Sequence, residues 1–245
     1  MKREISKKNK LLLLALIGIF VLGFLIAAAS VSEQNFFSET KKLFFGSEDN
    51  QELSTPVSYQ GKSPQAATAV TADDFAQGNI ESARLILVEY LDLNCIYCAR
   101  FHETLEAVLT EFDGEVAWVI RHYPLMGSFE EALAAECVGR QGGSDKFWEF
   151  TQAYYQDMLP LTVTQAEKLN SLKEKANSIG VEITDCLESE ESKNAVQAEY
   201  QNAQEIGLQG IPSTVLIFPE TGEKEVLAGA YSTEDMIEIL STYLR

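Results

Sequence analysis

Arg84-Leu-Ile-Leu-Val-Glu-Tyr90, followed by Cys95-Ile-Tyr-Cys98, is the stretch of the 245-residue sequence that decides the fold. Its first part is short, apolar and partly β-branched, which is typical of a buried strand. After the second cysteine, apolar residues recur at helical spacing up to the breaker Asp113-Gly114; they are Phe101, Leu105, Val108, Leu109 and Phe112. The sequence therefore predicts a strand, a Cys-x-x-Cys turn and a helix in direct succession.

Further strands and helices are predicted on both sides of a long helical tract. Residues 116–120 predict a second strand, and 214–218 and 226–228 predict two more. Ser232 caps a final amphipathic helix. From about 126 to 207 the sequence predicts only helices, over 129–138, 147–155, 164–179 and 193–206. Strands separated by helices imply an α/β layer, and the all-helical middle implies an insertion into it.

The composition excludes two classes of protein. Hydrophobic residues make up 46% of the chain, which excludes a globally disordered protein. The 37 Asp and Glu residues outnumber the 19 Lys and Arg residues, giving a formal net charge of −18. Because no basic surface is available to neutralise phosphates, we expect no binding to nucleic acid.

The amino terminus predicts a membrane segment. Five Lys or Arg residues within 1–10 precede an uncharged apolar run over 11–29. As a helix this run would be about 28 Å long, close to the hydrocarbon thickness of a bilayer. We favour a retained anchor within residues 1–30 and a polar linker over 31–70; cleavage after Ala27-Ala28-Ala29 would instead give a secreted form. In both cases the folded body, 71–245, is expected outside the cytoplasm.

The Cys-x-x-Cys turn places its first thiol at the start of a helix. Unpaired backbone N–H groups and the positive end of the helix dipole favour thiolate over thiol there. Cys95 is therefore the candidate exposed nucleophile, and Cys98 the candidate resolving thiol that attacks a mixed disulfide. Zinc is the alternative, but it needs four ligands and a second close Cys or His pair is missing from the sequence. We expect no metal and no cofactor.

The two remaining cysteines, Cys137 and Cys186, both fall in the helical tract. In an oxidising compartment, two unpaired thiols beside a dithiol oxidant would be a hazard, so we expect a structural disulfide between them. The loop that it closes, about 50 residues, corresponds to roughly 4 kcal/mol in the chain-entropy account. Two buried, unpaired thiols that act as small hydrophobic residues are the alternative.

The two histidines receive no catalytic role. His102 follows Cys98 by one helical turn and is expected to face solvent. His122 is expected to be a structural histidine with its hydrogen bonds satisfied, because the cysteine chemistry needs no external base. Phe147-Trp148 is expected in the core.

Glu89-Tyr-Leu-Asp-Leu-Asn-Cys-Ile-Tyr-Cys-Ala-Arg-Phe-His102 resembles the active-site segment of DsbA-like thiol:disulfide oxidoreductases, a branch of the thioredoxin fold with a helical insertion. Further stretches are similar to that family and occur in its order: Arg121-His-Tyr-Pro-Leu125, Ala134-Ala-Glu-Cys-Val138 with Lys146-Phe-Trp-Glu149, and Gly210-Ile-Pro-Ser-Thr214. The resemblance covers about residues 71–245 and implies an α/β, thioredoxin-like fold with an all-helical domain inserted at about 126–207. Ile96 departs from the proline that many members carry directly after the first cysteine, which leaves the redox potential open.

The resemblance also implies roles for three residues outside the dithiol. It implies a cis peptide bond before Pro212, packed against Cys95, with the backbone of Ile211 free to pair with an extended substrate peptide. It implies that Glu89 is a buried acid that moves protons during thiol exchange, with a pKa raised by burial. On the residues alone, Pro212 could be an ordinary strand-entry proline and Glu89 an exposed charge at a strand end.

The predicted function is the oxidation of cysteine pairs in exported proteins. Cys95 and Cys98 would pass their disulfide to a substrate through a mixed disulfide, and a membrane quinone-linked thiol oxidase would reoxidise them. A reductase or isomerase of the same fold is the first alternative, because about 30 mV is worth 1.4 kcal/mol for two electrons and the sequence does not fix the potential. A membrane-tethered binding module without redox turnover is the second, and the intact cysteines argue against it.

Overall fold

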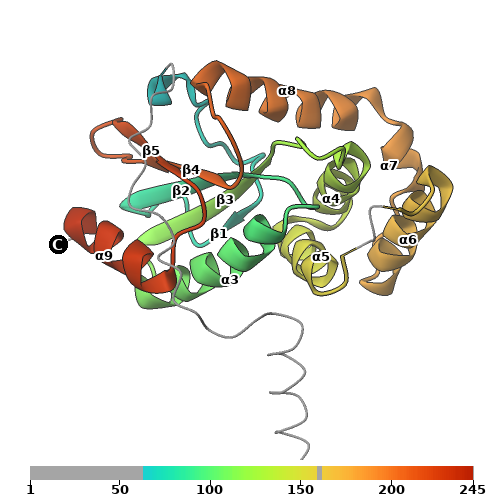
Figure 1. Ribbon diagram of the computed structural model, residues 1–245, viewed down its shortest axis with the longest axis horizontal. Helices are drawn as coiled ribbons and strands as arrows, with labels where there is room; N and C mark the ends of the chain where they lie inside the picture. The colour runs from blue at the N-terminus through green and yellow to red at the C-terminus, as the bar shows by residue number, and fades with distance from the viewer. Residues whose placement is uncertain (1–62, 159–161, 245) are drawn as a thin grey trace, which may run out of the picture. The chain divides into compact units, whose positions relative to one another are not determined.

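The structure is a computed structural model, which describes residues 63–158 and 162–244 (Figure 1). The expected membrane anchor and most of the expected linker lie outside these residues. None of the helices within the described ranges is both long enough and apolar enough to cross a bilayer. The last part of the expected linker belongs to the folded unit, because Pro64–Ala66 forms the 3-10 helix η1 and Ala67 is buried.

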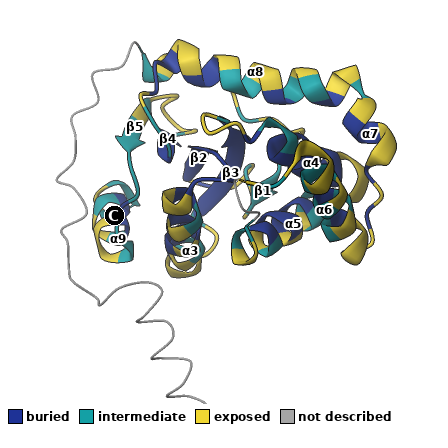
Figure 2. Ribbon diagram, turned by 45° about the vertical axis from the view of Figure 1, so that its right-hand side comes forward, coloured by how far each residue is buried: buried dark blue, intermediate teal, exposed yellow. Residues whose placement is uncertain are grey.

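The centre of the fold is a five-stranded sheet with the strand order β1-β3-β2-β4-β5. The strands are β1 (Ala76–Gln77), β2 (Leu85–Leu91), β3 (Val116–His122), β4 (Ser213–Ile217) and β5 (Lys224–Ala228). β2 and β3 pair in parallel, and the other three pairs are antiparallel. Every residue of β2 and β3 is buried (Figure 2), which explains why these strands read as apolar runs.

Helices cover both faces of the sheet (Figure 1). On one face lie α3 (Ile96–Glu111) and α9 (Thr233–Leu244), which contact each other. On the other face lie η1 and the C-terminal part of α8 (Glu190–Ile206). The two dithiol cysteines belong to the core on the α3 side.

Alternate residues of β2 divide between these two faces. Its odd-numbered apolar residues join the core on the α3 side, and its even-numbered residues join the core under α8. The first set is Leu85, Leu87 and Leu91, and the second is Ile86, Val88 and Tyr90. Glu89 has the parity of the first set, so its carboxyl group is placed on the side of the two cysteines.

The helical insertion stands between β3 and β4. Its described part contains α4 (Phe129–Gly142), α5 (Ser144–Gln156), α6 (Gln165–Ser178), α7 (Thr184–Glu188) and α8. α4 is central, because it contacts the other four helices. A disulfide with an S–S distance of 2.08 Å joins Cys137 of α4 to Cys186 of α7, the pairing that the sequence analysis expects. The short helix α7 has no predicted counterpart, because five residues are too few to show a period.

Candidate active site

The Cys-x-x-Cys turn lies at the start of α3, after the loop that leaves β2. Cys95 is the N-cap residue of α3, and its sulfur accepts a hydrogen bond from the backbone N–H of Cys98 at 3.4 Å. The first turn of a helix leaves such N–H groups without a carbonyl partner, so the Cys95 sulfur takes the place of the missing acceptor. Both Cys95 and Cys98 are free cysteines.

The pKa values of the two thiols are moved in opposite directions. A hydrogen bond from the Cys98 side chain is the main cause that lowers the pKa of Cys95 to about 6; the backbone N–H groups of Cys98 and Tyr97 add to it, and burial opposes it. Burial is the main cause that raises the pKa of Cys98 far above its ordinary range, and the neighbouring Cys95 and Glu89 raise it further. At neutral pH, Cys95 is therefore mostly thiolate and Cys98 a thiol, as a nucleophile and its resolving partner require.

The prediction that Cys95 is exposed is wrong, because only 5% of its surface is accessible. As the N-cap residue, it turns its sulfur back over the first turn of α3. The solvent-facing positions of that turn are occupied by Ile96 and Tyr97, which are 47% and 56% exposed. Cys95 is therefore accessible over a small area, next to two exposed apolar side chains.

Glu89 is fully buried in the centre of the sheet, so the alternative of an exposed strand-end charge is wrong. Its neighbours on the adjacent strands are Ile120 and Thr214. Neither carboxyl oxygen has a hydrogen-bond partner among the residues that the structure describes. Burial raises the pKa of Glu89 to about 8; the indole of Trp118 opposes this shift and the charge of Cys95 reinforces it. The group is therefore mostly protonated at neutral pH.

The Ile211–Pro212 peptide bond is cis and directly precedes β4. Pro212 is buried, and Ile211 is partly buried against the core cluster that contains Cys95 and Cys98. The Pro212 carbonyl accepts a hydrogen bond from the N–H of Gly229 at 2.9 Å. The backbone of Ile211 makes no hydrogen bond within the described ranges, so it is available to an extended peptide.

Sequence reasoning missed Asp92, a buried residue in the loop between β2 and α3. One carboxylate oxygen of Asp92 accepts the N–H of Asn94 at 2.7 Å, and the other accepts the N–H of Met126 at 2.6 Å. Its carbonyl accepts the N–H of Cys95 at 3.0 Å. Asp92 therefore ties the loop before Cys95 to the loop that follows β3. The sequence signal was Asp-Leu-Asn between a strand and a helix, since Asp and Asn side chains commonly bind nearby backbone in turns.

The prediction that His102 faces solvent is wrong, because only 4% of its surface is accessible. Its ring centroid lies 4.7 Å from that of Trp118 and 5.9 Å from that of Trp148. Burial lowers the pKa of His102 to about 4. Trp118 belongs to the sheet and Trp148 to the insertion, so α3 is buried on two sides at this position. His102 therefore lies on a second buried side of the helix.

His122 is buried at the end of β3. Its backbone N–H donates to a carboxylate oxygen of Glu199 at 2.7 Å. Neither ring nitrogen has a partner among the described residues, so the expectation of a satisfied histidine is wrong. Burial lowers the pKa of His122 to about 4. Across residues 63–158 and 162–244, no three His, Cys, Asp or Glu side chains are grouped as a metal ion would need.

Comparison with known proteins decides the family. The family model described as "Thioredoxin" matches residues 70–220, more than half of the chain. The chain belongs to the thioredoxin family. This thioredoxin-family chain is 31% identical over 142 residues to "Probable disulfide bond formation protein D" of Bacillus anthracis, a match that covers 54% of the chain and 65% of that protein.

A second relative carries a different name and matches a shorter part of the chain. The chain is 34% identical over 86 residues to "Na(+)/H(+) antiporter NhaA 1" of Mycolicibacterium vanbaalenii, a match that covers 34% of the chain and 13% of that protein. The chain therefore spans less than two thirds of the length of either relative.

A solved structure supports the architecture. The crystal structure of Wolbachia pipientis alpha-DsbA1 superposes with a TM-score of 0.64 and 14% sequence identity, covering 74% of this chain and 96% of that one. At this identity the likeness shows the fold alone. It confirms the α/β, thioredoxin-like fold, and together with the family model and the Bacillus relative it supports the resemblance to DsbA-like proteins.

Proposed function

We propose that this thioredoxin-family chain is an extracytoplasmic thiol:disulfide oxidoreductase that oxidises cysteine pairs in exported polypeptides. The observation that carries the proposal is the separation of the two thiols at the start of α3. The pKa of Cys95 is lowered to about 6, while that of Cys98 is raised far above its ordinary range. A pair with one stabilised thiolate is easily reduced, and a pair that is easily reduced oxidises other thiols.

The exchange proceeds in two displacement steps. A substrate thiolate attacks the sulfur of Cys95 in the disulfide form, and Cys98 leaves and takes up a proton. The second substrate thiolate then attacks the substrate sulfur of the mixed disulfide, and Cys95 leaves as a thiolate. The substrate gains a disulfide, and the active-site pair gains two electrons. Cys95 is the better leaving group in the second step because its pKa is low.

Glu89 is placed to serve the proton that accompanies Cys98. Glu89 lies on the α3 side of β2, the side of the two cysteines, and its charge raises the pKa of Cys98. With a pKa of about 8, Glu89 carries a proton at neutral pH and can donate it to the departing Cys98 thiolate. This assigns Glu89 a proton-transfer role, as the family resemblance implies.

An apolar rim around the dithiol favours unfolded polypeptides as substrates. In the described part of the chain, the exposed large hydrophobic residues are Ile96, Tyr97, Leu125 and Met126. The first two follow Cys95 in the chain, and Asp92 holds the backbone of Met126 beside the same loop. Exposed apolar side chains of this kind mark binding surfaces. They would contact apolar residues near a substrate cysteine, while the backbone of Ile211 pairs with the extended substrate chain.

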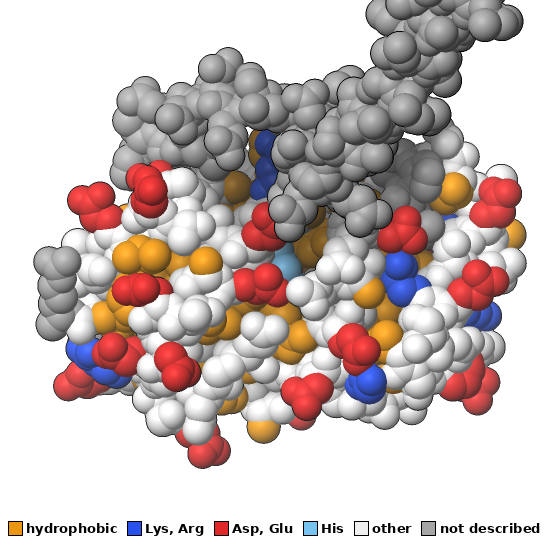
Figure 3. All heavy atoms as spheres, turned by 90° about the horizontal axis from the view of Figure 1, so that it is seen from below, with side chains coloured by type: hydrophobic (Ala, Val, Ile, Leu, Met, Phe, Trp, Pro, Cys, Tyr) orange, Lys and Arg blue, Asp and Glu red, His pale blue; other side chains and the backbone are white. Residues whose placement is uncertain are grey.

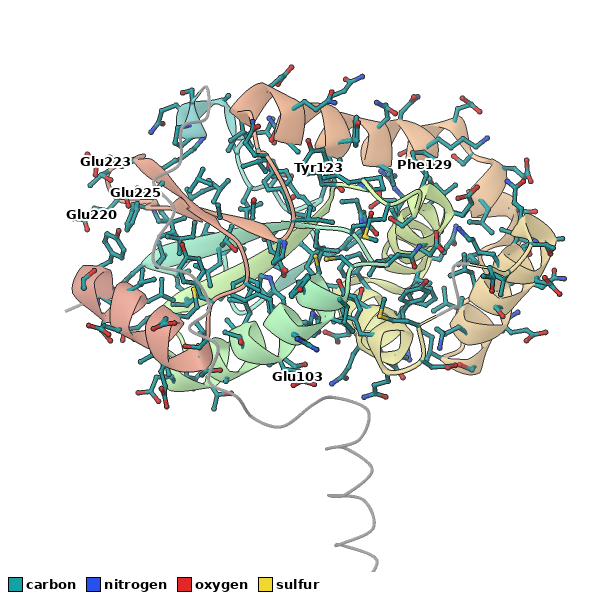
Figure 4. All side chains as sticks on the ribbon, viewed as in Figure 1. Glu103, Tyr123, Phe129, Glu220, Glu223 and Glu225 are labelled. Atoms are coloured by element: carbon teal, nitrogen blue, oxygen red, sulfur yellow. A yellow bond between two sulfur atoms is a disulfide. The ribbon has the colours of Figure 1, made fainter. Side chains whose placement is uncertain are left out.

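Acidic side chains lie on surface elements outside the four exposed residues of this rim. Figure 3 shows acidic side chains spread over the face seen from below in the view of Figure 1, with hydrophobic side chains between them. Glu103 extends from α3, and Glu220, Glu223 and Glu225 lie at the far end of the β4–β5 hairpin (Figure 4). The four exposed residues of the rim are themselves uncharged and largely apolar.

The proposed location rests on two observations. The disulfide between Cys137 and Cys186 is typical of an oxidising compartment. The basic flank and the apolar run over 11–29 are typical of a segment that exports and tethers the domain. We propose that the protein is anchored in the membrane with its redox domain outside, where a membrane quinone-linked thiol oxidase returns the pair to the disulfide.

The test uses the oxidised protein and a reduced, unfolded polypeptide with two cysteines. We expect stoichiometric loss of substrate thiols and appearance of the substrate disulfide. For the trapping arm the polypeptide is supplied in its disulfide form. The Cys95 thiolate of Cys98→Ser should displace one polypeptide thiol and remain as a mixed disulfide, because no resolving thiol follows, whereas Cys95→Ser should form none. Reduction of insulin without oxidation of the polypeptide would show a reductase instead, and inactivity in both assays would show a binding module.

A further inference from the structure

A buried polar network from the helical insertion holds the residue that precedes Cys95. The Nδ2 group of Asn94 donates to Oε1 of Glu131 on α4 at 3.1 Å. The hydroxyl of Tyr154 on α5 donates to Oδ1 of Asn94 at 2.7 Å. Glu131 in turn pairs with Nζ of Lys168 on α6 at 3.0 Å. Two helices of the insertion, α4 and α5, therefore contact the Asn94 side chain of the catalytic loop, and α6 holds the Glu131 partner.

This network fixes the Asn94 amide in one orientation. Glu131 presents only acceptor oxygens when it pairs with Lys168, so the NH₂ group of Asn94 must face α4 and its oxygen must face Tyr154. Asn94 is 7% exposed, and Glu131 and Tyr154 are fully buried. Water is therefore poorly able to replace these hydrogen bonds, and losing one leaves a buried polar group unpaired.

The stability of the Cys95 thiolate depends on where this loop sits. The sulfur of Cys95 lies 3.4 Å from the backbone nitrogen of Cys98, an ordinary separation for an N–H···S hydrogen bond, and such a bond weakens steeply as its angle is distorted. A small displacement of the loop would therefore weaken the donors that hold the thiolate. Asp92 fixes the loop from within, and Asn94 is the side chain through which the insertion fixes it from outside.

We propose that Asn94, held by Glu131 and Tyr154, is a positioning residue that keeps Cys95 at the N-cap of α3. The helical insertion thereby stabilises the Cys95 thiolate, in addition to shaping the domain. This inference rests on the proposed redox function. Its test measures the ionisation of Cys95, however, and needs no catalytic turnover.

The test compares variants that remove a hydrogen bond without changing charge. Asn94→Ala and Tyr154→Phe are made in the full-length protein with the active-site pair reduced, and the thiolate absorbance near 240 nm is followed against pH. We expect the Cys95 midpoint to rise by about 0.5 to 1 pH unit in Asn94→Ala and by less in Tyr154→Phe. Tyr243→Phe is the matched control, because its hydroxyl also donates over 2.7 Å, to Glu225, away from the site.

The variants leave the charged and titratable groups around Cys95 in place. These groups are Cys98 on α3, Asp92 in the loop, Glu89 on β2 and Tyr155 on α5. If only the charges of these groups mattered, the pH midpoint of Cys95 would not change in either variant. If Asn94 positions Cys95, the midpoint rises. If Asn94→Ala does not fold, Tyr154→Phe decides the matter.

A second pair of variants separates the hydrogen bond of Glu131 from its charge. Glu131→Gln and Glu131→Leu both remove the carboxylate that pairs with Lys168, but only Gln keeps an acceptor oxygen for Asn94. We expect the higher Cys95 midpoint in the Leu variant. Equal midpoints in this pair, or an unchanged or lowered midpoint in folded Asn94→Ala or Tyr154→Phe, would overturn the proposal. Failure of the redox function would instead appear in the wild type, as an inactive protein with an ordinary thiol titration.

Discussion

Replacing Glu89 with Gln should stabilise the protein in a pH-dependent way. Glu89 is fully buried, and its carboxyl oxygens have no hydrogen-bond partner among the described residues. Burial raises its pKa from the ordinary value of 4.5 to about 8. An uncharged amide of almost the same shape removes the cost of ionising the group and leaves the packing of β2 intact.

The magnitude follows from the two pKa values. Below pH 4.5 the carboxyl group is protonated in both the folded and the unfolded chain, so it does not affect the pH dependence of stability. Between pH 4.5 and 8 the unfolded chain releases the proton first, so the free energy of unfolding falls as the pH rises. At about 1.4 kcal/mol per pKa unit, the cost is roughly 3 kcal/mol at pH 7 and about 5 kcal/mol well above pH 8.

Urea unfolding at a series of pH values measures this difference. Wild type and Glu89→Gln are compared with the pair Cys95 and Cys98 reduced and the disulfide between Cys137 and Cys186 intact, as mass spectrometry after alkylation can verify. The advantage of the variant should be small at pH 4.5 and should grow to roughly 3 kcal/mol at pH 7. Glu103→Gln, on an exposed face of α3, should show no such growth. A constant difference between wild type and Glu89→Gln across this range would refute the reasoning.

Three further outcomes follow from the structure. Alkylation of Cys95 should show a rate midpoint near pH 6, measured by mass spectrometry of the quenched protein, and a midpoint near 8.5 would contradict its N-cap environment. Gly139→Ala should lower the free energy of unfolding by about 1–3 kcal/mol in urea titrations, because a Cβ there would lie 2.3 Å from the Phe75 ring; an unchanged midpoint would mean that the ring moves freely. The double variant Cys137→Ala/Cys186→Ala should lose about 4 kcal/mol in the same assay, given a sequence separation of 49 residues, and a loss below 1 kcal/mol would show that α4 and α7 hold together without the bond.

The local sequence pattern was enough to predict the Cys-x-x-Cys part of the site, which lies in one continuous stretch of chain. A buried strand followed by Cys-x-x-Cys and a helix places Cys95 at a helix start, whatever the rest of the fold does. The burial of Glu89 was implied only by the family resemblance, since the residues alone also allowed an exposed charge at a strand end. The placement of Cys95 at the helix start needs no knowledge of distant contacts.

Features that depend on distant contacts were beyond the sequence. Asn94 is held by residues 37 and 60 positions away, on two helices whose packing no local pattern encodes. His102 is buried because α3 packs against the insertion as well as the sheet. The sequence pattern shows only one apolar side of the helix, so it predicts that a polar residue on the other side is exposed. The strand β1 has two residues, too few to show alternation, and forms only because β3 offers it an edge.

The reduction potential of the pair formed by Cys95 and Cys98 tests the central claim most directly. A lowered pKa at Cys95 stabilises the reduced form, so the pair should be more oxidising than that of thioredoxin, which lies near −270 mV. Equilibration of the protein with glutathione or dithiothreitol buffers, followed by alkylation and mass spectrometry, gives the value. We predict a potential between about −270 mV and the −120 mV of DsbA. A potential of about −270 mV or lower would contradict the assignment as an oxidase of exported proteins.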